Sequence, residues 1–312
     1  MFLCVIRQKL SEKSGAVVVL VVFALTALLG ATALVIDAGM VYHRNVQLSN
    51  AVDAAALAAI QALPGAPALA QSLAECYALK NGVSADNLNI EISEDNHEIK
   101  VEAKSTVNHL FAQILGINST DVVKSAGAKI GNLSAVSGAV PFSIEAQELI
   151  YNEEYVLKSG SGGGKGGGGQ HTGWFGALRL GGNGASNYEK NIKNGYQKEI
   201  AIGDLLEVEN GNMSGPTTRG VNYRIAQCQH TPACTSASYV ETCPRLVTIP
   251  VVEPCGKKTV KVKGFAKFFL ERVDGQGNQN NVWGTFVQLH TIGEMTEDEE
   301  ADYGIYVSRL SY

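Results

Sequence analysis

The chain has 312 residues, a length that predicts two or three structural units rather than one small domain. It is 45% hydrophobic and 18% charged, which allows a buried core and excludes wholesale disorder. The formal net charge is −5, from 30 acidic and 25 basic residues. No basic face with interleaved aromatic residues is present, so nucleic acid is excluded as a partner.

A basic N-terminus precedes one long apolar segment. Arg7, Lys9 and Lys13 are followed by an uncharged run from Gly15 to Ile36, and Asp37 ends it. As a helix this run spans about 33 Å, close to the ~30 Å thickness of the hydrocarbon core of a bilayer. We therefore predict a transmembrane helix over 15–36. The positive-inside rule puts 1–14 in the cytoplasm and the bulk of the chain outside.

A cleaved secretory signal is the competing interpretation of this segment. The apolar core of such a signal is about 7–15 residues long and is followed by small residues and a break. Here the apolar run is longer, and a helical pattern continues without proline as far as Pro64. A retained single-pass anchor is therefore favoured, with the lipid bilayer as its first partner.

The helical pattern continues past the membrane as a predicted stalk over 37–63. Within the membrane, small residues on one helix face lead to Asp37 and favour close packing against another helix. Outside it, a narrow apolar stripe recurs at seven-residue spacing, with further members offset by four. A plain anchor helix without a partner is the alternative. The predicted helix-packing residues are Thr26, Gly30, Ala33, Asp37, Val41, Leu48, Val52, Asp53 and Ala55.

A small α/β module is predicted over 66–131, after the helix is broken by two prolines and a glycine at 64–67. Its pattern indicates two short helices and a three-stranded sheet, of which the first two strands form a hairpin. The expected helices are Ala68–Lys80 and Val107–Leu115, and the expected strands are Leu88–Ile92, Glu98–Glu102 and Asp121–Ile130.

Residues 140–312 have a different sequence pattern, which predicts a mainly antiparallel β domain outside the cell. Short β-branched or aromatic segments, among them Tyr223–Gln227, alternate with clusters of glycine and asparagine. The glycines, including Gly215 and Gly220, are expected at turns. The whole chain is thus predicted to be α+β: a transmembrane helix extended into a stalk, the small module, and the β domain.

No catalytic signature accompanies this organisation. The Gly-rich segment 159–169 contains Lys165 but lacks the spacing of a phosphate-binding loop, so we expect a flexible solvated loop. The chain has neither a G-x-S-x-G elbow nor an HExxH pair. We therefore expect a protein that is not an enzyme and needs no cofactor.

Four cysteines cluster in the β domain at the spacing C-x₅-C-x₈-C-x₁₁-C. Zinc ribbons use paired CxxC knuckles, which this pattern lacks. Because the domain is expected outside the cell, two disulfides are favoured over a zinc site, with three pairings possible. The candidate disulfide cysteines are Cys228, Cys234, Cys243 and Cys255.

The N-terminal residues resemble a known family. Gly15-Ala16 at the start of the apolar run, Asp37-Ala38-Gly39 at its end, and then Gln47, Asn50-Ala51 and the run from Asp53 to Ala58 are similar to the first segment of TadG-like proteins. These are associated with the Flp/Tad (tight adherence) pilus-assembly system. The resemblance covers roughly Ser14–Ile60 and implies a single-pass membrane component of a bacterial surface-pilus apparatus.

The chain departs in two respects from the sequence patterns of pilin-like and TadG-like proteins. Pilin-like relatives cut by prepilin peptidase are cleaved after a glycine and carry a glutamate at the fifth mature position. Gly15 and Ala16 provide a possible processing site, but Leu20 occupies that fifth position. Some TadG-like proteins also carry a von Willebrand A-type domain with a DxSxS metal site, and no such string exists in this chain.

We therefore expect a membrane-anchored, extracytoplasmic structural component of a Tad-type pilus or related bacterial surface apparatus. It would lie in the cytoplasmic membrane with its N-terminus inside. Its expected partners are other Tad pilus-assembly proteins or copies of itself. The alternative is a tethered surface protein whose β domain binds a ligand or wall polymer, and a surface hydrolase is the remaining possibility.

Overall fold

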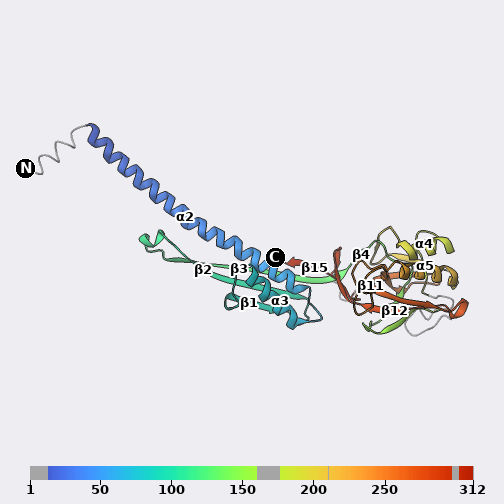
Figure 1. Ribbon diagram of the computed structural model, residues 1–312. Helices are drawn as coiled ribbons and strands as arrows, with labels where there is room; N and C mark the ends of the chain where they lie inside the picture. The colour runs from blue at the N-terminus through green and yellow to red at the C-terminus, as the bar shows by residue number, and fades with distance from the viewer. Residues whose placement is uncertain (1–12, 160–175, 210, 297–301, 312) are drawn as a thin grey trace, which may run out of the picture. The chain divides into compact units, whose positions relative to one another are not determined.

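The computed structural model describes residues 13–159, 176–209, 211–296 and 302–311, with side chains described from residue 17 onward. The chain divides into two compact units (Figure 1). Unit 1 comprises residues 1–129 and 310–312, and unit 2 comprises residues 130–309. The chain passes between the units within two of its strands, β3 (Ser119–Leu133) and β15 (Ile305–Ser311).

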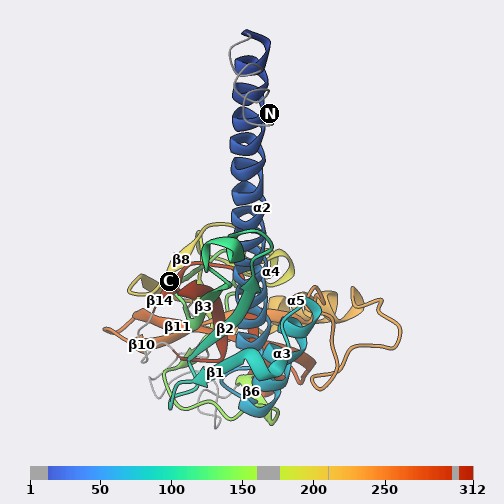
Figure 2. The same cartoon turned by 90° about the vertical axis from the view of Figure 1, so that its left-hand side faces the viewer.

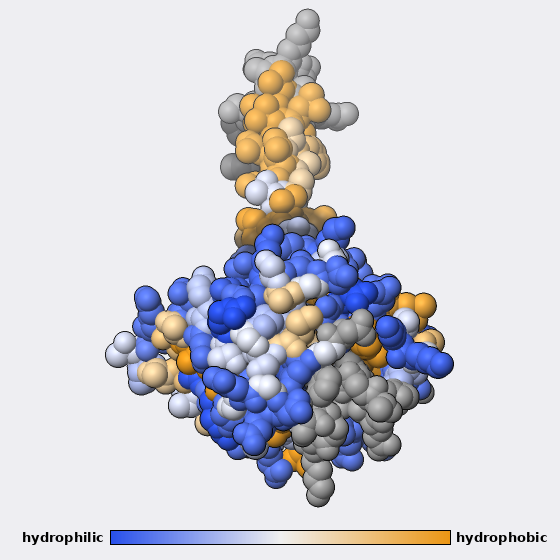
Figure 3. Space-filling model, turned by 90° about the vertical axis from the view of Figure 1, so that its right-hand side faces the viewer, coloured by the Kyte–Doolittle hydropathy of each residue, from blue (hydrophilic) through white to orange (hydrophobic). Residues whose placement is uncertain are grey.

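Unit 1 is built on one long helix, α2 (Lys13–Ile60), which contains no proline to interrupt it. Its N-terminal half stands clear of the rest of the unit in both ribbon views (Figures 1 and 2). The apolar side chains there face outward; Leu20, for example, is 69% exposed. This part forms a continuous hydrophobic surface (Figure 3). Among the described residues, α2 is the helix long and apolar enough to cross a membrane.

The C-terminal half of α2 packs against a second helix, α3 (Pro67–Lys80). Proline at the first helical position fits the start of α3, because its missing N–H has no partner inside the helix there. Both helices contribute buried alanines at four-residue spacing, which places small side chains on one face and lets the two backbones approach closely. These alanines are Ala51, Ala55 and Ala59 of α2 and Ala70, Ala74 and Ala78 of α3.

Three antiparallel strands of a six-stranded sheet complete unit 1. A 3₁₀ turn, η1 (Ala85–Asn87), leads into β1 (Leu88–Ile92), which pairs with β2 (Glu98–Asn108), and β2 pairs with β3. Alternate residues of β2 are buried, namely Ile99, Val101 and Ala103, and β2 contacts α2. The predicted hairpin is confirmed.

Two details of unit 1 differ from the sequence prediction. The helix expected over Val107–Leu115 is wrong: β2 continues to Asn108, and one 3₁₀ turn, η2 (Ala112–Leu115), follows. The cause is the long ladder in which Asn108 still pairs with Ser119 of β3. The stalk expected over 37–63 is not free along its length, because from Leu48 onward one face of α2 is buried in the module.

Unit 2 is centred on a mainly antiparallel sheet. Its strand order is β5 (Ile144–Glu145), β10 (Leu246–Pro254), β11 (Thr259–Asp274), β12 (Asn281–Val287) and β6 (Glu154–Lys158). Strand β9 (Leu205–Val208) pairs with β11, and β7 (Leu178–Arg179) pairs with β9. The β5–β10 pair is parallel and the other pairs of this sheet are antiparallel.

The remaining short strands of the chain belong to two other sheets. β4 (Ala135–Val136) pairs with β8 (Ile200–Ala201), β13 (Leu289–Thr291) runs parallel to β15, and β14 (Met295–Thr296) pairs with the end of β3. A 3₁₀ turn, η3 (Gly277–Gln279), precedes β12. The core of unit 2 is aromatic: the rings of Phe268 and Phe286 meet edge to face with centroids 4.9 Å apart. The α+β fold with a β-rich second part is as predicted.

Two helices of unit 2, α4 (Ala185–Asn194) and α5 (Ser214–Ala226), were not predicted. Tyr223–Gln227, expected to be strand-like, instead ends α5. Gly215 and Gly220, expected at turns, lie inside α5. Gly220 is required by packing, because a Cβ there would come within 2.6 Å of Ile192 Cγ2 on α4.

Candidate functional site: the anchor helix and a cysteine–histidine cluster

Asp37 ties the anchor helix to the tip of the β2–β3 hairpin. It is the first residue of α2 after the apolar run, and its side chain is only 1% exposed. The carboxylate accepts hydrogen bonds from three consecutive backbone N–H groups: Leu110 (2.8 Å), Phe111 (3.0 Å) and Ala112 (2.6 Å). N–H groups at the start of a helical turn have no partner within the turn itself. Asp37 therefore caps η2 from another element.

These hydrogen bonds favour the ionised form of Asp37. Burial by itself would raise the pKa of this carboxyl. The N–H groups of Leu110, Ala112 and Phe111, together with nearby His109, outweigh burial and lower the pKa below its usual value. The cap is accordingly a charged one at neutral pH, and charged hydrogen bonds of this kind are stronger than neutral ones.

The tip that Asp37 holds is apolar and exposed. We call residues 110–117, between β2 and β3, the hairpin tip; they carry no charged side chain. Ile114 is 86% exposed and Leu115 is 74% exposed. Both ribbon views place this green loop beside α2, close to where the helix leaves its module (Figures 1 and 2). Large hydrophobic side chains exposed in the tip are Leu110, Phe111, Ile114, Leu115 and Ile117.

The predicted helix-packing residues fall into two groups. Thr26 and Gly30 are exposed on the projecting half of α2, and Ala33 is half-buried. Val41 and Asp53 are also half-buried. The structure leaves the projecting residues open to a partner, and packing there against another helix stays a prediction.

The second group lies in the core of unit 1. Leu48, Val52 and Ala55 are almost fully buried in the region where α2 contacts α3 and β2. Their seven-residue stripe is therefore occupied by the chain's own module. The predicted processing site, Gly15 and Ala16, lies within α2, where side chains are not described.

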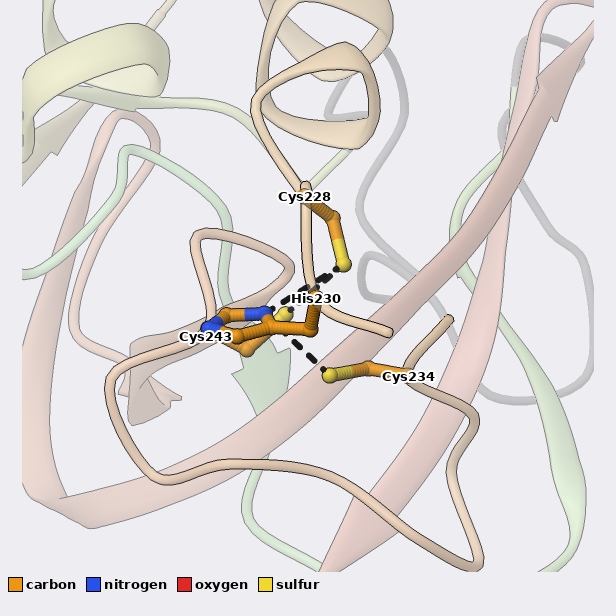
Figure 4. A group of neighbouring side chains, drawn as sticks. All are labelled: Cys228, His230, Cys234 and Cys243. Atoms are coloured by element: carbon orange, nitrogen blue, oxygen red, sulfur yellow. Dashed lines mark hydrogen bonds between the residues drawn. The ribbon is translucent and has the colours of Figure 1, made fainter. Parts of the chain in front are cut away.

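A second group of functional side chains lies in unit 2, in the loop between α5 and β10. Cys228, His230, Cys234 and Cys243 place their ligand atoms within 4.8 Å of one another (Figure 4). His230 Nδ1 is 3.4 Å from Cys234 Sγ and 3.7 Å from Cys228 Sγ. The sulfurs of Cys228 and Cys243 are 3.5 Å apart. All four groups thus converge on one point.

Arg245 fixes this loop to the sheet. Its guanidinium donates hydrogen bonds to the backbone oxygens of Cys234 (2.9 Å) and Leu270 (2.8 Å) and to the carboxylate of Glu271 (2.8 Å). The same guanidinium lies over the ring of Phe269, 4.5 Å from its centroid. Cys234 and Cys243 are buried against Phe269 and neighbouring apolar residues. These contacts hold the loop against the sheet although it contains no long helix or strand.

The two ends of the cluster differ in their proton affinity. The side chain of His230 and then the backbone N–H of Cys234 lower the pKa of the Cys228 thiol to about 6. Burial raises the pKa of the Cys243 thiol to about 11.

The cysteines predicted to be paired are only partly brought together. Cys228, Cys234 and Cys243 lie in the cluster, whereas Cys255 is exposed and outside it. All cysteines in the described part of the chain are free thiols, so their pairing stays a prediction. Sequence reasoning noted His230 and His290 in the same domain but did not place His230 with the cysteines. The signal that points to it is its place between two cysteines, in the pattern C-x-H-x₃-C.

The predicted Gly-rich loop lies almost entirely outside the described residues. Of the Gly-rich segment 159–169, only Ser159 is among the described residues, and Lys165 lies outside them. Ser159 is buried at the end of β6.

Comparison with known proteins assigns the N-terminal segment. Residues 15–70 match the family model described as putative Flp pilus-assembly TadE/G-like. This segment comprises α2 from Gly15 onward and the start of α3. The resemblance predicted from Gly15-Ala16, Asp37 and Asp53 is therefore confirmed. No curated protein and no solved structure matches the chain.

Proposed function

We propose that this chain, with its Tad-type N-terminal segment, is a structural component of a Tad-type pilus or related bacterial surface apparatus. It is anchored in the cytoplasmic membrane by residues 15–36, with residues 1–14 in the cytoplasm and the bulk of the chain outside. The proposal rests on one observation above all. A single helix has exposed apolar side chains over its first half and is built into a folded module over its second.

Exposure of these apolar side chains to water is energetically unfavourable. Side chains such as Phe23 and Leu29 are more than half exposed on the projecting helix. Each large aliphatic or aromatic side chain moved out of water contributes roughly 1.5–3 kcal/mol. Insertion into a bilayer therefore removes an unfavourable surface that the fold of unit 1 leaves uncovered.

The direction of insertion follows from charge. Arg7, Lys9 and Lys13 precede the apolar run, and the first charged residue after it is the buried Asp37. Positively charged flanks are retained in the cytoplasm. Thr26, Gly30 and Ala33 then provide a small-residue face for another membrane helix, from a pilus-assembly protein or a second copy.

Isolation from native membranes tests the assignment to a pilus apparatus. The tagged full-length chain is cross-linked in cells, solubilised in detergent and purified, and its partners are identified by mass spectrometry. Enrichment of Tad pilus-assembly proteins or of cross-linked copies of the chain supports the proposal. Recovery of a wall polymer or other ligand without such proteins favours the tethered binding protein.

The intact mass of the same preparation decides the fate of Gly15 and Ala16. A chain that begins at Met1 is a permanent anchor, as Leu20 at the fifth position after Gly15 favours. A chain that begins at Ala16 has been processed after Gly15 and is a pilin-like subunit of the same apparatus.

A further inference from the structure

We propose that Cys228, His230, Cys234 and Cys243 form a structural zinc site in unit 2. This inference is independent of the role of the N-terminal helix. Zinc in structural sites takes four cysteine and histidine ligands in a closed tetrahedron, and three cysteines with one histidine are a common set. All four residues belong to the loop between α5 and β10.

The distances within the cluster favour one central ion over a pairwise bond. Zinc–sulfur and zinc–nitrogen bonds of ~2.3 and ~2.0 Å place neighbouring ligand atoms of a tetrahedron about 3.5–3.8 Å apart. Three of the six separations among the four ligand atoms are 3.4, 3.5 and 3.7 Å. The other three are no longer than 4.8 Å. A disulfide would join two sulfurs at about 2.05 Å and leave the third sulfur and the imidazole without a role.

The surroundings support the ligands. Backbone N–H groups of Cys234 and His230 point at Cys228 Sγ, and that of Arg245 points at Cys243 Sγ. Such N–H donors stabilise thiolates bound to a metal. Arg245 also fixes the backbone of Cys234. The role of the ion is to hold the loop between α5 and β10 against the sheet.

Elemental analysis of the full-length chain, purified in detergent without chelators, tests this site. We expect one zinc ion per chain in the wild-type protein and loss of that zinc in Cys234→Ser and His230→Ala. Cys255→Ser and Cys76→Ser are matched controls because both cysteines are exposed and outside the cluster. Each control should retain the zinc.

A wild-type measurement covers the case in which Cys234→Ser does not fold. Exchange of the bound ion for Co²⁺ should give the visible bands of a tetrahedral, thiolate-rich site. A disulfide between any two of Cys228, Cys234 and Cys243, found by non-reducing peptide mapping in metal-free protein, would overturn the proposal. So would zinc that persists in both ligand variants.

We further infer that the hairpin tip, residues 110–117, lies in the interface of the bilayer that α2 crosses. This second inference rests on the proposed membrane anchor and concerns a different unit. The tip is bound through Leu110, Phe111 and Ala112 to Asp37, the first residue after the apolar run. If Ile36 ends the membrane span, the tip is at the level of the membrane surface.

The composition of the tip fits that depth. The rest of unit 1 leaves the large apolar side chains of the tip exposed. The tip also carries no charged side chain that would oppose its burial among headgroups and acyl chains. Apolar segments held at the interface bind in proportion to the apolar area they bury. The ion pair between Lys104 and Asp121 (2.8 Å), further along β2 and β3, marks where the hairpin becomes charged and solvated.

Tryptophan quenching in vesicles tests the depth of the tip. The full-length chain is reconstituted in phosphatidylcholine carrying brominated acyl chains. Ile114→Trp is expected to be quenched relative to vesicles without bromine. Ile292→Trp is the matched control, since Ile292 is a fully exposed isoleucine of unit 2; its added fluorescence should not change. Leu25→Trp reports on the anchor helix itself.

The three variants separate the two proposals. Quenching of Leu25→Trp without quenching of Ile114→Trp would overturn the interfacial tip and leave the anchor intact. Quenching of neither would overturn the anchor as well. A blue-shifted but unquenched Ile114→Trp would mean that a protein surface, from a second copy or another partner, covers the tip instead of lipid.

Discussion

At the residue scale, Asp37 determines how the module is attached to its anchor. A single carboxylate on α2 binds three successive backbone N–H groups that lie more than 70 positions later in the chain. Among the described residues, Asp37 is the side chain that accepts hydrogen bonds from these N–H groups. The orientation of the hairpin tip relative to the helix therefore depends strongly on this one side chain.

Substitution of Asp37 by Asn should loosen the hairpin tip. The amide offers one oxygen acceptor and no charge, so the N–H groups of Leu110, Phe111 and Ala112 cannot all be satisfied. We expect hydrogen exchange of these amides to accelerate about tenfold or more, because hydrogen bonds to charged groups each contribute ~1.5–3 kcal/mol. Asp86→Asn, at an exposed aspartate of the same unit, should leave their exchange unchanged.

The same exchange measurement has a defined pH dependence. The folded-state pKa of Asp37 is lowered, so its contribution is fully present above the unfolded value of ~3.9. It is lost as the pH falls through the lower folded value. Exchange protection at Leu110–Ala112 that disappears near neutral pH would contradict this account of the cap.

Lys158 is a second residue whose burial has a measurable consequence. It lies at the end of β6 with no exposed surface, and its Nζ donates to Asn212 Oδ1 (2.8 Å) and Asn280 Oδ1 (3.4 Å). Burial lowers the pKa of this ammonium to about 8. Between that value and the unfolded value of ~10.4, the unfolded state binds more protons. Stability from this group therefore rises with pH across that window.

Replacement of Lys158 by Met should remove this rise, which amounts to about 3 kcal/mol at most. The measurement compares the free energy of unfolding in urea at pH 8 and pH 10 for wild-type and variant chains. Lys257→Met is the control, because Lys257 is exposed on the same sheet's loop. An unchanged pH dependence in Lys158→Met would show that Lys158 is not buried as described.

At the scale of elements, α5 illustrates what local sequence does not reveal. Its sequence, SGPTTRGVNYRIA, contains two glycines and a proline, which argue against a helix on propensity alone. The helix is stabilised by packing: Pro216, Thr217, Gly220 and Val221 are buried, and α5 contacts both α4 and β11. Tertiary contacts thus override propensity here, whereas α2, with its uninterrupted apolar and alanine-rich sequence, was predicted directly.

A pair of alanine substitutions tests this packing. Gly220→Ala should destabilise unit 2 by about 1–3 kcal/mol, because the new methyl group would collide with Ile192. Gly215→Ala is the matched control in the same helix, where the nearest atom is the flexible end of Arg219 at 3.3 Å. It should be neutral or stabilising by about 0.5–1 kcal/mol, because alanine favours helix.

Unfolding in urea, followed by tryptophan fluorescence to which Trp283 in β12 contributes, measures both variants. The expected order of stability is Gly215→Ala, then wild type, then Gly220→Ala. Equal stability of the two variants would mean that α4 and α5 do not pack as closely as the structure places them.

The cysteine–histidine cluster was hidden from sequence for a different reason. Cys228, Cys234 and Cys243 were grouped correctly by proximity along the chain, but Cys255, only 12 positions after Cys243, is not part of the cluster. His230 becomes a member only because the loop folds back on itself. Spacing alone cannot rank a histidine against a fourth cysteine when no CxxC pair fixes the register.

At the scale of the whole molecule, the features that sequence predicts best are those that repeat. Hydropathy over 15–36 and alternation in β1 and in the first part of β2 are local patterns, and the structure has a helix and a hairpin at these places. The contact between Asp37 and the hairpin tip is not local, because the two segments are more than 70 positions apart in the sequence. The residues with the most specific contacts were therefore the hardest to predict.

We propose that one helix, α2, holds the residues that follow its membrane span outside the cytoplasmic membrane. The most direct test is labelling of wild-type cells, converted to spheroplasts, with a membrane-impermeant maleimide, followed by mass spectrometry. Cys76 and Cys255 are exposed thiols in unit 1 and unit 2. We predict that both react in intact spheroplasts and that Cys4 reacts only after permeabilisation. Protection of Cys76 and Cys255 until the membrane is opened, with Cys4 labelled from outside, would contradict the account.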